Sequence, residues 1–243
     1  MKEGKSRVKA AFWLLGVGGV LITAAIIALY TPWLPIFDLR QVSISGNREI
    51  PTLDIARASQ LRRGVPVAGV ALSAVRARIE SLPWVQRARV QRAFPHQIAI
   101  HIKERAAIAK ITQTSGACLL VGEGGVIVAT ECAGRDVPAV RGVEVSSGEA
   151  GARVTTPGAA AFLDALSAAQ LPGLVVSRVD LLGDLSVEVH ASSGCVVRFG
   201  PLREAADRVR YLEAVCLAVD ADEYLTIDLR FGGEATLVPR VRR

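Results

Sequence analysis

Side chains that commonly carry catalysis or bind metals are scarce in this sequence. It has three histidines and four cysteines in 243 residues, with no Cys-x-x-Cys pair and no Cys/His spacing that suits zinc. There is no Gly-x-Ser-x-Gly motif, and the glycine-rich run Glu123–Gly125 lacks the Lys-Ser/Thr of a phosphate-binding loop. These absences argue against a hydrolase, a nucleotide-binding enzyme and a metalloenzyme, and predict a non-enzymatic protein without cofactor or metal.

Charge is distributed unevenly along the chain. Residues 1–9 carry four basic and one acidic side chain, residues 38–105 carry twelve and five, and residues 106–243 carry thirteen and seventeen. The contrast between the last two segments predicts two modules and argues against nucleic acid as a partner. The basic module either has an ordinary arginine-rich surface in water or presents a face to anionic lipid headgroups.

Charged residues are absent from Ala10 to Phe37. The first twenty-one residues of this stretch, up to Tyr30, are mostly apolar and are enough for a helix to cross about 30 Å of hydrocarbon. Trp13 lies near one end, with Tyr30 and Trp33 at the other, as is typical of interfacial anchors. We therefore predict a transmembrane helix over residues 10–33.

The charges that flank this helix predict its orientation. The positive-inside rule places the basic tail, residues 1–9, in the cytoplasm and residues 38–243 on the periplasmic or extracytoplasmic side. The alternative is a cleaved signal peptide with its site near Thr23–Ala25. The apolar run is longer than the usual h-region and continues past Ala25, which favours an uncleaved single-pass anchor in the inner (cytoplasmic) membrane.

Residues 38–105 have the pattern of a small α+β domain. Apolar residues alternate at 39–45, 86–92 and 98–103, which predicts strands, and they recur every three or four residues in two short helices, at 51–61 and 72–82. The predicted order is β-α-α-β-β. Trp84 follows the second helix and is expected to pack that helix against the sheet.

Residues 106–243 are predicted to form a mainly antiparallel β domain with two helices, at 157–170 and 202–219. Alternation predicts strands at 107–112, 117–121, 126–129, 175–180, 186–190, 195–199, 226–230 and 235–238. No element is predicted for 130–155, and His190 is expected to face solvent.

All four cysteines lie in this distal segment, at positions 118, 132, 195 and 216. Disulfides are permitted if the segment lies outside the cytoplasm. A Cys118–Cys132 bridge across a hairpin is one possibility, and four buried free thiols are another.

Several runs of residues together give the sequence a family resemblance. Leu82–Val85 (LPWV), Arg92–Pro95 (RAFP) and an alternating strand that ends in Lys103–Arg105 (KER) resemble a POTRA domain of the FtsQ type. Gly194–Gly200 (GCVVRFG), the helix after it and Ile227–Phe231 resemble the distal β domain of the same proteins. The chain is thus identified as a member of the FtsQ/DivIB family, with a POTRA domain at 37–105 and a β domain at 106–243.

The resemblance implies a non-catalytic scaffold of the bacterial divisome, which links early and late division proteins at the septum. It implies binding of the FtsB–FtsL pair by β-strand addition, and FtsK-, FtsW- and FtsI-like proteins as further partners. Carried over to this sequence, the partner-binding residues are the last strand and its flank: Arg178, Arg230, Phe231, Ala235, Thr236, Leu237 and Val238. The alternatives are ordinary core packing for Phe231 and a strand-end ion pair between Asp228 and Arg230.

Two other functions are compatible with a POTRA domain. A factor for outer-membrane protein assembly would end in a β-barrel of many roughly ten-residue strands with aromatic girdles, whereas residues 106–243 have two predicted helices and few aromatics. A generic envelope scaffold or anchored chaperone is the other alternative.

Overall fold

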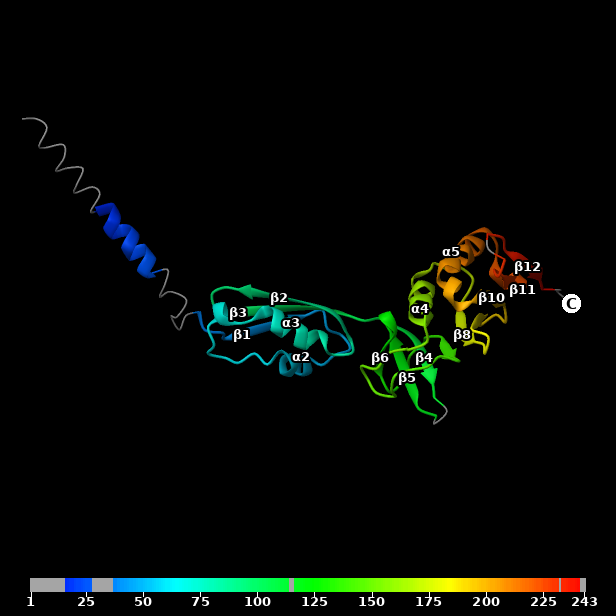
Figure 1. Ribbon diagram of the computed structural model, residues 1–243, viewed down its shortest axis with the longest axis horizontal. Coiled ribbons are helices and arrows are strands. Elements are labelled where there is room, and N and C mark those ends of the chain that lie inside the picture. Colours follow the sequence, from blue (N-terminus) through cyan, green and yellow to red (C-terminus); the bar gives the residue numbers. More distant parts are fainter. Residues whose placement is uncertain (1–15, 28–36, 114–115, 232, 241–243) are drawn as a thin grey trace, which may run out of the picture. The chain divides into compact units, whose positions relative to one another are not determined.

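The computed structural model describes residues 16–27, 37–113, 116–231 and 233–240 (Figure 1). These residues form two compact units, one of residues up to 79 together with 87–102, and one of residues 80–86 together with 103–243. Residues 16–27 are helical. The predicted tail, 1–9, and both ends of the predicted transmembrane helix, 10–33, lie outside the described residues. Among those described, no helix is both long and apolar enough to span a bilayer.

The smaller unit contains the predicted β-α-α-β-β order. Its strands β1 (Gln41–Ser45), β2 (Val85–Ala93) and β3 (Gln97–Glu104) form a sheet in the order β1-β3-β2, with β1 parallel to β3. The helices are α2 (Thr52–Ser59) and α3 (Leu72–Glu80). The unit is therefore an α+β domain, as predicted.

Aliphatic side chains at regular spacing form the core of this unit. β3 turns alternate residues inward, and α2 and α3 add one or two buried residues each; the buried side chains are Ile55, Val75, Ile79, Ile98, Ile100 and Ile102. Burying each contributes roughly 1.5–3 kcal/mol. Arg92, at the end of β2, donates from Nε to the Val67 carbonyl (2.9 Å) and from Nη2 to the Val70 carbonyl (2.7 Å). These bonds tie the loop before α3 to the end of β2.

The larger unit is a nine-stranded mixed sheet with two helices. Its strand order is β12-β11-β10-β9-β8-β7-β4-β5-β6, in which five neighbouring pairs are antiparallel and three are parallel. The helices are α4 (Ala159–Ala168) and α5 (Leu202–Ala218). The strands are β4 (Ala107–Thr112), β5 (Cys118–Gly122), β6 (Val126–Ala129), β7 (Ala139–Arg141), β8 (Val176–Leu181), β9 (Ser186–Ala191), β10 (Val196–Pro201), β11 (Tyr224–Asp228) and β12 (Thr236–Pro239).

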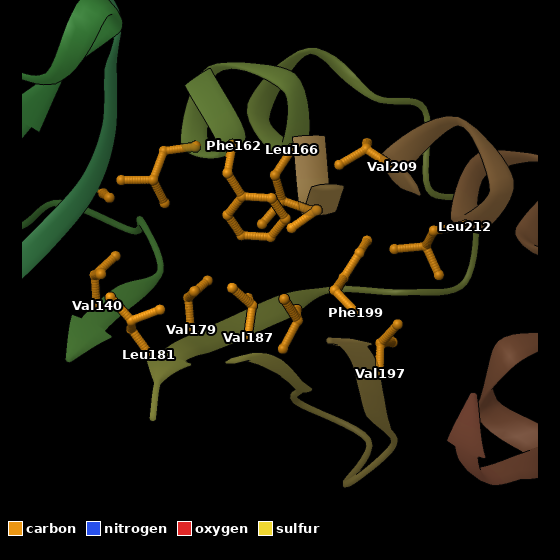
Figure 2. Close-up of a cluster of buried hydrophobic side chains, with 14 of the residues drawn as sticks. Val140, Phe162, Leu166, Val179, Leu181, Val187, Val197, Phe199, Val209 and Leu212 are labelled. Atoms are coloured by element: carbon orange, nitrogen blue, oxygen red, sulfur yellow. The ribbon is translucent and has the colours of Figure 1, made fainter. Parts of the chain in front are cut away.

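Both helices pack on one face of this sheet, where the core lies (Figure 2). Val179, Val187 and Val197 point from neighbouring strands toward Phe162 of α4 and are almost fully buried. The rings of Phe162 and Phe199 meet edge to face, 5.2 Å between centroids and 74° between planes, a geometry that aromatic pairs favour. This core holds the middle of the sheet together.

Strand β7 is an element that sequence patterns did not predict. It has three residues, lies within the unassigned segment 130–155, and pairs in parallel with both β4 and β8. It therefore joins the β4-β5-β6 part of the sheet to the β8-to-β12 part. A strand this short, directly after Pro138, has too few residues to show a period of two.

Trp84 is half-buried, and the Arg135 guanidinium lies over its ring at 5.6 Å, so Trp84 contacts a loop of the unit to which it belongs. The predicted environment of His190 was wrong. His190 does not face open solvent: its side chain is 22% exposed and Nε2 lies 3.0 Å from Oδ2 of Asp180 on β8.

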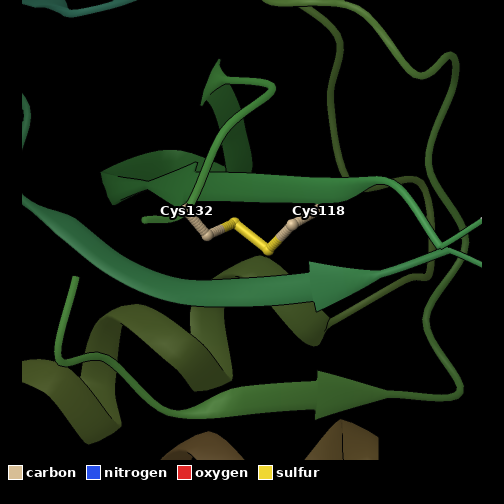
Figure 3. Close-up of a disulfide and its surroundings, with 2 residues drawn as sticks. All are labelled: Cys118 and Cys132. Atoms are coloured by element: carbon tan, nitrogen blue, oxygen red, sulfur yellow. A yellow bond between two sulfur atoms is a disulfide. The ribbon is translucent and has the colours of Figure 1, made fainter. Parts of the chain in front are cut away.

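The structure distinguishes the two possibilities for the cysteines. Cys118, at the start of β5, forms a disulfide with Cys132, beyond the end of β6 (Figure 3). Cys195 and Cys216 are buried free thiols. Burial, together with the neighbouring Cys195, raises the pKa of the Cys216 thiol to about 11, so this thiol is protonated and unreactive at neutral pH.

Replacing Cys118 and Cys132 together by serine is expected to lower the free energy of unfolding by about 3 kcal/mol. The bridge closes a loop across 14 positions, and loops of this size lose about that much unfolded-chain entropy when cross-linked. Urea unfolding with and without reductant measures the effect. The oxidised parent should lose stability on reduction and the double variant should not; equal midpoints for all four samples would contradict the expectation.

Candidate partner-binding edge of the distal sheet

The two edges of the nine-stranded sheet differ in what covers them. Beside β6, the Ile127 amide donates to the Ala152 carbonyl and the Gly151 amide donates to the Ile127 carbonyl, both at 2.8 Å. The other edge is β12, which pairs only with β11 among the described strands. A strand edge without a neighbour presents unpaired main-chain donors and acceptors and is a template for an added strand.

The direction of each β12 amide follows from one hydrogen bond. The Arg240 amide, directly after the strand, donates to the Glu223 carbonyl (2.8 Å). Amides alternate in direction along a strand, so those of Val238 and Thr236 point toward β11 and that of Leu237 points away from it. The remaining outward position within β12 is Pro239, which has no N–H. Because its nitrogen faces away from β11, the proline removes no hydrogen bond between β12 and β11.

Side chains at the C-terminal end of β12 hold it to the sheet. Arg240 Nη2 donates to the Ser193 carbonyl in the turn between β9 and β10 (2.7 Å). On the core face, Leu237 lies opposite Ile227 and packs against the buried cluster. The edge is thus fixed by one arginine and one leucine, while Val238, on the other face, is 46% exposed.

An ion pair and an exposed ring follow the end of β11, beside the start of β12. Asp228, opposite Thr236 in the ladder, accepts from Nε and Nη2 of Arg230, with Nη2 to Oδ2 at 2.7 Å. Arg230 in turn lies 5.4 Å from the ring centre of Phe231. The ring is 66% exposed, which excludes core packing for Phe231. The contact between Asp228 and Arg230 is the strand-end ion pair that was the alternative for Arg230.

A glycine makes room for this arrangement. Gly200, at a register shift of β10, has a φ of +73°. A Cβ at this position would lie 2.9 Å from Nη1 of buried Arg208 and 3.2 Å from Cγ of Arg230. The glycine therefore allows both arginines to approach the end of β10.

Arg178 does not flank this edge. It lies on β8, and β9, β10 and β11 separate it from β12, which corresponds to about 19 Å at the usual strand spacing. Its Nε donates instead to Oδ2 of Asp180 (2.8 Å), the same oxygen that His190 approaches. Sequence patterns placed Arg178 on a strand but did not give the strand order.

Stability should depend on pH through Asp228. Its hydrogen bonds with Arg230 hold the pKa of this carboxyl below the usual value, against the opposing effect of burial. A lowered folded-state pKa stabilises the fold above the unfolded pKa of about 4, and this contribution is lost as the pH falls through the folded pKa. Asp228→Asn should therefore reduce the acid-side loss of stability measured by urea titrations from pH 7 to pH 3, with Asp54→Asn, an exposed carboxylate, as the control. Identical pH profiles for the parent and Asp228→Asn would contradict this expectation.

A hollow of about 720 Å³ lies elsewhere in this unit. Its wall is largely apolar, with Leu163 and Val179 among the lining residues, and its polar groups already bond one another. Asp164 accepts from the Gly124 amide (2.9 Å), and Arg105 Nη1 donates to the Glu123 carbonyl (2.8 Å). Within the described residues there is no cluster of side chains that could hold a metal ion.

Comparison with known proteins gives one matching family model, "POTRA domain, FtsQ-type", over residues 37–105. The chain is 28% identical to cell division protein FtsQ of Salinibacter ruber over 93% of this chain and 92% of that protein. It is 22% identical to cell division protein DivIB of Clostridium acetobutylicum over 68% of each chain. It is also 31% identical to cell division protein FtsQ of Mycolicibacterium smegmatis, but this match spans only 42% of this chain and 29% of that protein.

Proposed function

Because the chain belongs to the FtsQ/DivIB family of cell division proteins, we propose that it is a membrane-anchored scaffold of the divisome that binds its partners without catalysis. The β12 edge is the observation that carries this proposal. It offers main-chain groups at a fixed position, held by Leu237 and Arg240, with the Phe231 ring close to its start. Such an edge recognises an extended segment through its backbone and needs no reactive side chain.

The partner proposed for this edge is an FtsB–FtsL-like pair. A strand from the pair adds alongside β12, pairs with the outward main-chain groups of Ala235 and Leu237, and places an apolar side chain against Phe231 or Val238. The guanidinium of Arg230, already paired to Asp228, adds positive charge for an acidic side chain of the partner. Other division proteins, FtsK-, FtsW- and FtsI-like, are bound elsewhere on the chain, and the protein so links early and late components at the septum.

A single span of the cytoplasmic membrane is proposed for residues 10–33, with the tail 1–9 inside the cell. The helical part, residues 16–27, exposes large apolar side chains all around; they include Val20, Leu21, Ile22, Ile26 and Ile27. Its one hydroxyl, Thr23 Oγ1, donates to the Gly19 carbonyl of the preceding turn (2.8 Å). A helix without a polar face, whose hydroxyl is satisfied internally, suits hydrocarbon and not water.

Depletion of the protein in its host tests the proposal. Long filaments without septa but with segregated nucleoids are expected, and re-expression of the full chain should restore septation. Normal septation with loss of outer-membrane proteins would contradict the proposed function and favour the assembly-factor alternative.

A further inference from the structure

One end of the smaller unit, the proximal end, directly follows the apolar segment. It contains the turn Phe94–His96, the loop Arg62–Val65 and the first residues of β1. Because β1 and β3 are parallel, with Gln41 opposite Gln97, both strands begin at this end. Five residues lie between Trp33 and Leu39, so the six steps from one to the other reach about 20 Å or less. The proximal end therefore starts close to the membrane into which we propose that residues 10–33 insert.

Main-chain hydrogen bonds hold the loop and the turn on either side of β1. The Leu39 amide donates to the Val65 carbonyl (2.8 Å), and the Gly64 amide donates to the Leu39 carbonyl (3.0 Å). On the other side, the Arg40 amide donates to the His96 carbonyl (2.9 Å). Two strand spacings place the loop and the turn about 10 Å apart. The Arg92 bonds to the Val67 and Val70 carbonyls fix the segment that directly follows this loop.

The proximal end exposes two large apolar side chains. Phe94 at the tip of the turn is 62% exposed, and Val65 in the loop is 38% exposed. An exposed aromatic ring at the tip of a rigid turn, close to a bilayer, suits the interfacial region of that bilayer.

Arginines flank these apolar side chains. Arg62 and Arg63 are exposed in the same loop, and neither guanidinium has an ion pair or hydrogen bond within the part of the chain that the structure describes. Arg40 and Arg92 add two more positive charges at this end; the Arg92 guanidinium donates to the Val67 and Val70 carbonyls, and Asp38 carries a negative charge two residues before Arg40. An apolar tip within a positively charged surface matches anionic phospholipids, which attract basic residues with about 1 kcal/mol each.

We propose that the proximal end docks on the anionic headgroups of the membrane that anchors the chain. Phe94 and Val65 enter the interface, and Arg62 and Arg63 contact lipid phosphates. This docking rests on the membrane anchoring proposed above, but not on the β12 edge. It restricts the tilt of the smaller unit on the membrane and so limits the positions that the rest of the chain can reach.

Hydrogen exchange of the full chain in lipid nanodiscs tests the docking. Nanodiscs of phosphatidylcholine alone are compared with nanodiscs that contain one third phosphatidylglycerol. We expect the amides of residues 62–65 and those of Ala93, Phe94 and His96 to exchange more slowly with the anionic lipid, and the difference to shrink as salt is raised. Arg62→Glu with Arg63→Glu should weaken docking by roughly thirtyfold or more, because loss of the two positive charges alone accounts for about fivefold per arginine. Phe94→Ser should reduce the protection in the same two segments.

A matched control separates this surface from general charge attraction. Arg87→Glu with Arg89→Glu makes the same change in net charge on β2, about 17–23 Å from Phe94 at the usual strand rise. This control should keep the lipid-dependent protection, and equal loss in both double variants would overturn the proposal. Identical exchange in the two lipids by inserted protein would overturn the docking alone. A chain that does not insert into nanodiscs at all would overturn the anchoring and the docking together. The proposed binding of a partner at β12 would not be affected, because it is tested separately.

Discussion

Phe199→Ala is expected to lower the free energy of unfolding of the larger unit by about 3–5 kcal/mol. The ring is fully buried, meets Phe162 edge to face at 5.2 Å, and lies on β10, which supports β11 and β12. Few other side chains in this unit fill as much space, and loss of the ring leaves a cavity that rigid neighbours cannot close. Domains have only about 5–15 kcal/mol of stability in total, so this one change should remove a large part of it.

Urea unfolding followed by circular dichroism measures this loss. Phe231→Ala is the matched control: it removes the same ring from an exposed position, and surface changes usually stay within about 0.5 kcal/mol. A similar midpoint for Phe199→Ala and Phe231→Ala would contradict the account of the core.

Ala235→Pro is expected to weaken partner binding by roughly tenfold or more while the unfolding midpoint stays unchanged. Residue 235 lies two positions before Leu237, so by alternation its amide also points away from β11. Proline removes this donor and places its ring where the added strand would lie. The side chain of Ala235 is exposed, so no core packing is lost. Titration of the full chain in nanodiscs with a soluble form of the FtsB–FtsL-like pair measures the effect.

Two substitutions at the next position separate backbone recognition from side-chain recognition. Thr236→Ala keeps every main-chain group and should bind within about twofold of the parent. Thr236→Pro removes an amide that faces β11, so it should loosen β12 itself and lower both stability and binding. Tight binding by Ala235→Pro together with weak binding by Thr236→Ala would show that side chains, and not the strand edge, carry recognition.

Periodicity predicted most of the elements because burial on one face imposes it. In β3, Ile98, Ile100 and Ile102 alternate with exposed or half-buried residues, and the strand was found within two residues of its expected limits. The final strand, expected at 235–238, is β12 at Thr236–Pro239. β7 was missed because three residues carry no period, although it joins the two parts of the nine-stranded sheet.

Strand order and side-chain partners could not be read from the sequence in the same way. Arg178 was assigned to the β12 edge, but the sheet places three strands between them. Asp180 and His190 lie ten positions apart in sequence and meet only because β8 and β9 form a hairpin in that register. Phe231 is a large apolar residue of the kind that usually lies in a core. It is exposed because β11 ends at Asp228, three residues before it. Such contacts depend on the tertiary fold, whereas alternation is a local property.

Residue-resolved hydrogen exchange of the larger unit, in the full chain with and without the FtsB–FtsL-like pair, tests the proposed strand addition most directly. The account predicts that the outward amides of Ala235 and Leu237 become strongly protected in the complex, while those of Thr236 and Val238, which face β11, change little. Binding of the pair with no change at Ala235 and Leu237 would contradict strand addition at β12.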